Sequence, residues 1–180
     1  MDAIVTNAAG CGSNVKEYGH LLRDDPQYAS RAKQFSAKCQ DVSETVVNMG
    51  QQAKRNEMRL RVAFHDSCHL QHAQGVLNQP RQLLNEIPGI EIVEIPEAPI
   101  CCGSAGIYNL VQPNAANELG DRKAGLIASL DADVVVTGNP GCILQLQAAL
   151  SRAGKKIPVL HTIQLVDASI RGVSLTAVRE

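Results

Sequence analysis

The sequence of 180 residues predicts an α/β protein with a mostly parallel sheet and flanking helices. Two observations support this fold class. Short β-branched segments recur along the chain, and most are apolar nearly throughout, as strands buried on both faces of a parallel sheet tend to be. Segments with helix start and stop signals lie between them, and such alternation with short connections is typical of parallel α/β sheets.

Five segments are expected to form the strands. Four of them are apolar almost throughout, whereas the segment at 90–95 alternates between apolar and charged residues. The expected strands are AIVT (3–6), RVAFH (61–65), IEIVEI (90–95), DVVVTG (133–138) and IPVLH (157–161).

Four segments between these strands are expected to form helices. Proline suits the first turn of a helix and glycine suits the residue after its last turn, which places Pro80 and Pro113 at helix starts and Gly154 at a helix end. The polar, unpatterned stretch 51–59 indicates a linker. The expected helices cover 26–52, 79–87, 112–130 and 141–154.

An internal repeat supports a division of the chain into two units. DAIVTNAAGC ends at Cys11, DVVVTGNPGC ends at Cys142, and an ungapped alignment of the two matches five positions. Each unit is expected to contain a buried strand, a tight turn and a cysteine where the turn ends. Only the second unit has strands and helices before its cysteine, so the chain is expected to begin inside its first unit.

The composition argues against several functional classes. A net charge of -1 gives no electrostatic footprint for nucleic acid, and 3% aromatic residues provide few surfaces on which bases could stack. The apolar segments are strand-sized and too short to span a bilayer, and no secretory signal pattern is visible. We therefore expect a reducing cytoplasm, where grouped cysteines bind metal or do redox chemistry more often than they form disulfides.

Four of the six cysteines are predicted to form one metal site. They follow three of the expected strands, at the edge of an open parallel sheet where sites are built. Four thiolates are the usual ligand set of an iron–sulfur cluster. Neighbouring glycines, Gly103 among them, allow backbone N–H groups to approach sulfur closely. The four cysteines are Cys68, Cys101, Cys102 and Cys142.

Other interpretations stay open at this stage. Zinc is the main competing metal for four cysteines, although the paired C-x₂₋₄-C spacing of structural zinc sites is absent. Cys39, in an expected helix, is interpreted as a small buried hydrophobe, and Cys11 is either structural or a metal ligand. The histidines of HDSCHLQH are expected to cap helices or to form hydrogen bonds beside the metal site, with a histidine-bound metal as the alternative; they are His65, His69 and His72.

The segment from CHLQHAQG through CCGSAGIYNLVQP to GNPGC resembles the cysteine-rich CCG domain. This domain occurs in heterodisulfide reductase subunits and in iron–sulfur subunits of several flavin dehydrogenases. In detail, CCGSAGIYNLVQP, GNPGC and NAAGCGSNVKEYGHLL are most similar to the iron–sulfur subunits of glycolate oxidase, also called glycolate dehydrogenase.

The resemblance implies an arrangement of units within the C-terminal portion of a longer subunit. It implies the C-terminal part of a first CCG unit at 1–52, a linker at 53–59 and a complete CCG unit at 60–180. Cys11 would close the first unit. Heterodisulfide reductases end the pattern with Cys-x-x-Cys, but this sequence has Asn139 at the earlier position, so a fifth thiolate is not expected. The complete unit would contain Cys68, Cys101, Cys102, Gly103 and Cys142.

The resemblance also implies a function. The chain is expected to carry an iron–sulfur cluster of the 4Fe-4S type and to pass electrons from glycolate oxidation toward a quinone-type acceptor, without oxidising glycolate itself. FAD is expected only on partner flavoprotein subunits. The expected location is the cytoplasm or the inner face of the cytoplasmic membrane. The alternatives are a heterodisulfide reductase-like thiol–disulfide subunit, an iron–sulfur subunit for lactate or another 2-hydroxy acid, and a docking protein without metal.

Overall fold

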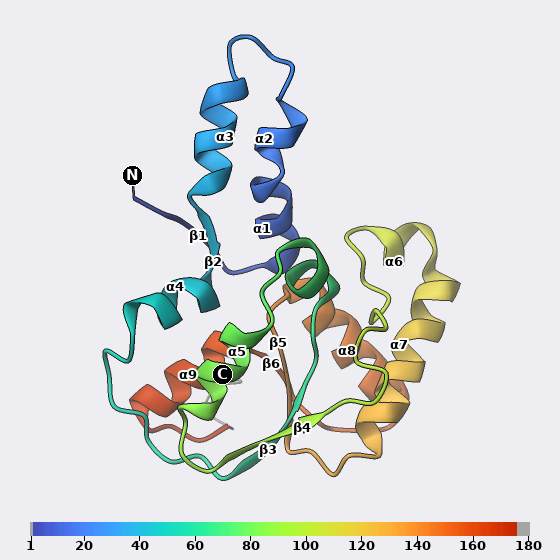
Figure 1. The fold of residues 1–180 in the computed structure, drawn as a ribbon. Coiled ribbons are helices and arrows are strands. Elements are labelled where there is room, and N and C mark those ends of the chain that lie inside the picture. Colours follow the sequence, from blue (N-terminus) through green and yellow to red (C-terminus); the bar gives the residue numbers. More distant parts are fainter. Residues whose placement is uncertain (1, 176–180) are drawn as a thin grey trace.

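Residues 2–175 are described by a computed structural model, which confirms an α/β fold with parallel sheets flanked by helices (Figure 1). One sheet has the strand order β4-β3-β5-β6, a second sheet pairs β1 with β2, and the described strand pairs are all parallel. The strands are β1 (Ile4–Thr6), β2 (Cys39–Asp41), β3 (Leu60–Phe64), β4 (Ile90–Glu94), β5 (Val134–Thr137) and β6 (Val159–His161). The helices are α1 (Ala9–Lys16), α2 (Tyr18–Leu21), α3 (Ala29–Ala37), α4 (Val42–Met49), the π-helical turn η1 (His69–Ala73), α5 (Asn78–Asn85), α6 (Tyr108–Val111), α7 (Pro113–Ala128), α8 (Pro140–Arg152) and α9 (Thr162–Arg171).

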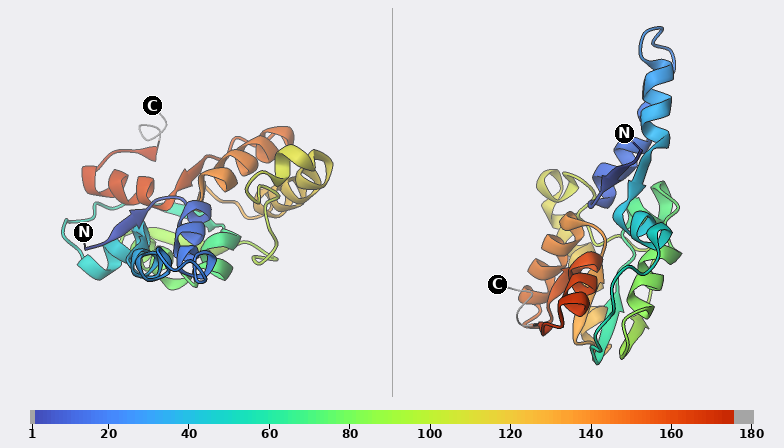
Figure 2. Two further views of the ribbon diagram at one scale, coloured as in Figure 1. Left: turned by 90° about the horizontal axis from the view of Figure 1, so that it is seen from above. Right: turned by 90° about the vertical axis from the view of Figure 1, so that its left-hand side faces the viewer.

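The four-stranded sheet is the middle of three layers (Figures 1 and 2). Helices α5 and α9 cover one face, where their side chains pack with Phe64 and Val136. Helices α7 and α8 cover the other face, around Ala63 and Val135. Because successive strand residues point to opposite faces, β3 and β5 are buried on both sides. This burial explains why their sequences are apolar without polar alternation.

The N-terminal unit is smaller and more open. Its two strands have three residues each, and helices α2 and α3 form a hairpin that projects from the rest of the molecule (Figures 1 and 2). Tyr18 and Phe35 stack within this hairpin with ring centroids 6.1 Å apart, yet both side chains remain partly exposed. The hairpin makes the connection from β1 to β2 longer than the connection from β5 to β6.

The structure contains the predicted internal repeat. In each unit a short turn joins a strand to a helix: Ala8 precedes α1 with φ −149° and ψ 111°, and Asn139 precedes α8 with φ −142° and ψ 121°. These two residues are aligned in the repeat, so Cys11 and Cys142 occupy equivalent places in the first helical turn. The two turns also touch, because the Gly10 N–H donates to Asn139 Oδ1 at 3.3 Å.

The repeat extends further along the chain than the sequence comparison indicates. In each unit the next strand, β2 or β6, ends at the cap of a helix, α4 or α9. Asp41 accepts a hydrogen bond from the Ser43 N–H, and Glu44 accepts one from the Asp41 N–H. His161 caps α9 in the same way, with Gln164 in the place of Glu44. Both units therefore share a strand–helix–strand–helix order that ends with a capping box.

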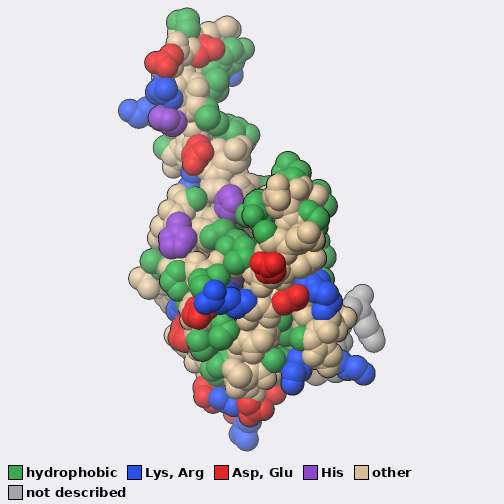
Figure 3. Space-filling model, turned by 90° about the vertical axis from the view of Figure 1, so that its right-hand side faces the viewer, with side chains coloured by type: hydrophobic (Ala, Val, Ile, Leu, Met, Phe, Trp, Pro, Cys, Tyr) green, Lys and Arg blue, Asp and Glu red, His purple; other side chains and the backbone are tan. Residues whose placement is uncertain are grey.

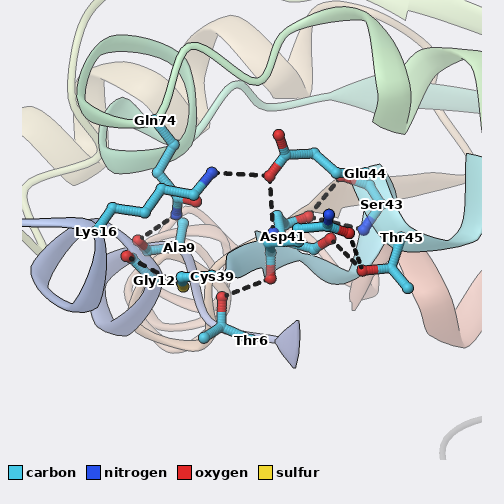
Figure 4. Close-up of polar contacts among 11 residues, drawn as sticks. Thr6, Ala9, Gly12, Lys16, Cys39, Asp41, Ser43, Glu44, Thr45 and Gln74 are labelled. Atoms are coloured by element: carbon cyan, nitrogen blue, oxygen red, sulfur yellow. Dashed lines mark hydrogen bonds and ion pairs between the residues drawn. The ribbon is translucent and has the colours of Figure 1, made fainter. Parts of the chain in front are cut away.

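The single helix expected over 26–52 is wrong, since α3, β2 and α4 share that segment. Cys39 lies in a strand; its thiol is buried and donates to the Gly12 carbonyl at 3.8 Å, which agrees with a structural role (Figure 4). Parallel pairing with β1 overrides the weak strand propensity of the Cys-Gln-Asp segment. The Lys16–Glu44 ion pair, 2.8 Å long, then ties α1 to the first turn of α4 (Figure 4).

The remaining elements agree with the sequence within a few residues, apart from helices α1, α2, α6 and α9 and the π-helical turn η1, which were not expected. Residues 50–59 form neither helix nor strand. This segment is held against α9, because Asn56 Nδ2 donates to the Ser169 carbonyl at 2.8 Å.

Acidic and basic side chains are intermingled on the face shown in Figure 3, without a segregated basic patch on that face. This mixture agrees with the net charge of -1. Within residues 2–175, no helix combines the length and the apolar character that crossing a membrane requires.

Candidate metal centre

Three neighbouring strands bring four cysteines to one edge of the sheet. β3, β4 and β5 are adjacent and parallel, so their carboxyl ends lie side by side. Cys68 lies in the loop between β3 and η1, the pair Cys101 and Cys102 lies in the loop after β4, and Cys142 lies in the first turn of α8. The site therefore follows from strand order, as expected for an open parallel sheet.

The four thiols form a continuous chain of contacts. The side chains interact pairwise in the order Cys68, Cys101, Cys102, Cys142. Cys102 and Cys142 are buried, whereas Cys68 and Cys101 are partly exposed. The chain of sulfurs thus runs from the interior toward the surface, and the described cysteines are all free thiols.

Hydrogen bonds between the thiols divide them into two types. Hydrogen bonds from Cys102 and Cys68 lower the pKa of Cys101, and a hydrogen bond from Cys102 lowers the pKa of Cys142. Donation to these sulfurs, together with burial, raises the pKa values of Cys68 and Cys102. The arrangement therefore favours thiolates at Cys101 and Cys142, and the thiolate is the form that binds metal.

Two N–H groups contact the sulfurs, one from Gly103, as the sequence led us to expect, and one from the side chain of Asn139, which was not expected to donate. The Gly103 N–H donates to Cys101 Sγ at 3.3 Å, and Asn139 Nδ2 donates to Cys142 Sγ at 3.4 Å. Such hydrogen bonds stabilise negative charge on sulfur. Both residues therefore lie where they can influence bound metal through its ligands.

His65 also belongs to this group, in closer contact than the sequence indicated. Its ring and the sulfurs of Cys102 and Cys142 offer three ligand atoms that all lie within 4.8 Å of one another. The ring contributes to the lowered pKa of Cys142 through a hydrogen bond. His65 is 1% exposed, and its Nδ1 atom has no hydrogen-bond partner among the described residues.

The loop that carries His65 is held rigidly by an ion-pair network. Arg81 of α5 donates to both carboxylate oxygens of Asp66, each at 2.7 Å, and also to Glu94 at the end of β4. The Arg81 guanidinium stacks over the Phe64 ring at 4.5 Å. These contacts fix the carboxyl ends of β3 and β4 relative to each other, and they occupy the Asp66 carboxylate.

Lys123 of α7 is a buried cation that the sequence gave no reason to place near the site. It is 1% exposed, and its Nζ donates to the Glu97 carbonyl at 2.7 Å, in the loop that leads to the cysteine pair. Burial lowers the pKa of Lys123, while the charges of Glu97, Cys102 and Cys101 act in the opposite direction. Lys123 therefore places a positive charge close to the two adjacent thiols.

The other histidines of the motif have different surroundings. His69 Nδ1 lies 2.9 Å from Ser13 Oγ of α1, so this residue joins the two units of the chain. His72 is exposed. Of the three histidines near Cys68, His65 is thus the one whose ring reaches the buried sulfurs Cys102 and Cys142.

Cys11 is not part of the described chain of contacting thiols. It is exposed and lines a cavity of about 360 Å³ between the first turns of α1 and α8. His69, Ser104 and Asn139 line the same cavity. A metal-binding role for Cys11 stays a prediction.

The donor set at the sheet edge is rich in sulfur. It consists of four thiols and one imidazole, and the carboxylate of Asp66 in the β3 loop is engaged by Arg81. Thiolate-rich sets with imidazole suit zinc, copper(I) or iron–sulfur clusters rather than magnesium or calcium. The residues present therefore fit an iron–sulfur cluster.

The fold and the gathered thiols define an α/β protein with a cysteine-rich site at the carboxyl edge of its sheet. The profile of the cysteine-rich domain family CCG matches residues 62–147, the segment that contains all four thiols. The chain belongs to this family, since similarity to a curated relative also extends over 93% of its length.

The chain is similar to three curated relatives in particular. It is 39% identical over 170 residues to the "Probable glycolate oxidase iron-sulfur subunit" of Bacillus subtilis (strain 168), covering 92% of this chain and 38% of the relative. It is 36% identical over 171 residues to the "Glycolate oxidase iron-sulfur subunit" of Escherichia coli (strain K12), covering 94% and 40%. It is 30% identical over 168 residues to "Lactate utilization protein A" of Geobacillus kaustophilus (strain HTA426), covering 93% and 70%. The chain thus spans about two fifths of the length of the two glycolate oxidase subunits.

Proposed function

We propose that Cys68, Cys101, Cys102 and Cys142 hold an iron–sulfur cluster of the 4Fe-4S type, and that the chain acts as an electron-transfer subunit of an oxidoreductase. The observation that supports this most is the convergence of four thiols from three adjacent strand ends. Iron is preferred over zinc because two of the relatives named above are called iron-sulfur subunits. The cluster supplies one-electron chemistry; glycolate oxidation itself is assigned to another subunit.

The protein side chains determine how such a centre would behave. Burial of Cys102 and Cys142 keeps water from half of the ligand set, and the partly exposed Cys68 and Cys101 leave a side open to an electron donor or acceptor. N–H groups of Gly103 and Asn139 stabilise sulfur charge. Fewer water contacts and more N–H donors are the two features by which proteins tune cluster potentials.

For the whole complex, we propose the glycolate oxidase type. In this proposal a flavoprotein subunit carrying FAD oxidises glycolate, and electrons pass through this chain toward a quinone-type acceptor. The proposal locates the protein in the cytoplasm. If a quinone is the acceptor, the protein would act at the inner face of the cytoplasmic membrane. The identities of 39% and 36% to the glycolate oxidase subunits, against 30% to the lactate utilization protein, support glycolate.

We further propose that residues 1–52 are the C-terminal part of a first CCG unit, that 53–59 is a linker and that 60–180 is a complete unit. The shared strand–helix–strand–helix order of the two units supports this division. Cys11 would then serve the first unit, because it occupies the position equivalent to Cys142.

Metal analysis of anaerobically purified protein tests the proposal. After incubation with ferrous iron and sulfide, we expect about four iron and four sulfide ions per chain, as a 4Fe-4S cluster requires. Cys102→Ser should lose most of this iron, whereas Cys39→Ser, which changes a thiol in β2 outside the chain of contacting thiols, should keep it. Zinc in place of iron, or iron without sulfide, would refute the proposal.

Two observations favour other functions, and each has its own assay. The side chains of the adjacent Cys101 and Cys102 interact, and the pKa of Cys101 is lowered. This suits a thiol–disulfide subunit, because the thiolate is the form that attacks a disulfide. Disulfide reduction by the reconstituted chain would establish this function.

The chain covers 70% of the lactate utilization protein, which favours lactate as the substrate of the complex. Reduction of the cluster by lactate, and not by glycolate, in the presence of co-purified flavoprotein subunits would establish that substrate.

A further inference from the structure

We propose that His65 is a direct nitrogen ligand of the metal centre, so that an imidazole joins the four thiols. This inference rests on the proposed function, since it needs a metal at the thiols. It adds one residue, with a nitrogen donor atom, to the four sulfur ligands.

The backbone places the His65 ring close to the two buried sulfurs. His65 directly follows β3, and its N–H donates to the Val136 carbonyl of β5 at 2.8 Å. The ring therefore lies at the junction of the two strands that lead to Cys68 and Cys142. Its ligand atom lies within 4.8 Å of the sulfurs of both Cys102 and Cys142, so a metal centre bound to these sulfurs would also be within reach of the ring.

The ring is polar, enclosed and incompletely satisfied. His65 is 1% exposed, and within the described residues Nδ1 has no hydrogen-bond partner. A buried polar group without a partner keeps the full cost of its lost contact with water. The carboxylate of the adjacent Asp66 does not serve it, because Arg81 occupies both oxygens.

The lack of a partner at Nδ1 has a chemical consequence. Ligating histidines are normally neutral, with the proton on one ring nitrogen and a lone pair on the other. Because Nδ1 has no hydrogen-bond partner within the described residues, the hydrogen bond of the ring to Cys142 comes from Nε2, which leaves the lone pair of the neutral ring on Nδ1 available to a metal. A neutral imidazole in place of a thiolate raises the potential of an iron–sulfur centre, as it does where two histidines replace two cysteines in Rieske proteins.

Pulsed electron paramagnetic resonance on the reduced, iron- and sulfide-loaded protein tests the assignment. The protein is labelled with ¹⁵N-histidine, and we expect a strongly coupled histidine nitrogen that disappears in His65→Ala. The matched control is His72→Gln, which changes an exposed histidine of the same motif and should leave the coupling unchanged.

Two further variants separate ligation from a hydrogen bond to Cys142. His65→Cys offers a metal ligand, and it should keep the iron and lower the reduction potential. His65→Gln offers a hydrogen bond but a poor ligand, and it should lose iron while thermal unfolding shows that it is folded. The reverse pattern, with iron kept by Gln and lost by Cys, would assign His65 to hydrogen bonding and overturn the proposal.

The outcomes distinguish this inference from the function on which it rests. Protein that takes up iron and sulfide but shows no strongly coupled histidine nitrogen overturns the role of His65 and leaves the electron-transfer function standing. Protein that takes up no iron overturns both. Iron, sulfide and a histidine coupling that survives in His72→Gln and not in His65→Ala support both.

Discussion

Gly103, directly after the cysteine pair, is the position where one added carbon should do the most damage. Its φ is +92°, a left-handed conformation, and a Cβ built there would overlap the backbone carbonyl oxygen of Ala116 in α7. Backbone strain of this kind costs about 1–3 kcal/mol, and overpacking against a fixed backbone adds about 1–3 kcal/mol. Alanine also lowers the conformational entropy of the unfolded chain, which offsets about 0.4–1 kcal/mol of this loss of stability.

We therefore expect Gly103→Ala to lower the free energy of unfolding by about 1–6 kcal/mol. For a chain of this length the melting temperature should fall by about 2–24 °C. Gly106→Ala is the matched control, because Gly106 in the same loop has φ +67° but nothing within 4 Å of an added Cβ. It should lose only about 0–3 kcal/mol.

Urea unfolding of the metal-free Gly103→Ala and Gly106→Ala variants, compared with the unmodified chain, measures both changes in the free energy of unfolding. The difference between the variants isolates the overlap with Ala116. Equal stability of Gly103→Ala and Gly106→Ala would refute the close packing of the cysteine loop on α7. Gly103→Ala should also hold less iron, because relief of the overlap with Ala116 moves the loop and displaces the backbone N–H that donates to Cys101 Sγ.

Three further predictions concern residues around the centre. Lys123→Met removes a buried positive charge near Cys101 and Cys102 and should make the cluster potential more negative in a redox titration; an unchanged potential at full iron content would argue against this role. Cys39→Ala should cost about 1 kcal/mol of stability, a usual value for a point mutation, and leave the iron content unchanged, which iron loss would contradict. Burial lowers the pKa of His161, so as the pH falls this histidine is protonated in the unfolded state before it is protonated in the folded state. The free energy of unfolding should therefore fall as the pH drops below about 6.5, by at most about 1.4 kcal/mol per pH unit from this group. The same dependence on pH in His161→Asn would rule this out.

The sequence was sufficient to predict the fold class and the gathering of four cysteines. Parallel strands align their carboxyl ends, so cysteines that follow three strands meet at one edge once those strands are neighbours. The equivalence of Cys11 and Cys142 was also visible, because both strand and turn are local features. The metal-binding role of these cysteines stays a prediction that metal analysis decides.

Features that depend on contacts between distant segments could not be predicted in the same way. β2 has only three polar or small residues, and its strand conformation comes from pairing with β1 across the α2–α3 hairpin. Lys123 lies in α7 beside other charged residues, and its burial goes with a contact to a distant segment, the Glu97 carbonyl in the loop after β4. His65 was expected as the last residue of a strand, and its place close to Cys102 and Cys142 requires the adjacency of β3 and β5.

X-ray absorption at the iron K-edge tests the central claim, that the four thiols hold an iron–sulfur cluster, most directly. The iron- and sulfide-loaded protein should show sulfur neighbours together with iron–iron scattering, and Cys102→Ser should lose both. A spectrum with oxygen and nitrogen neighbours and no iron–iron scattering would contradict the claim, because it would mean isolated iron ions that the cysteines do not assemble into a cluster.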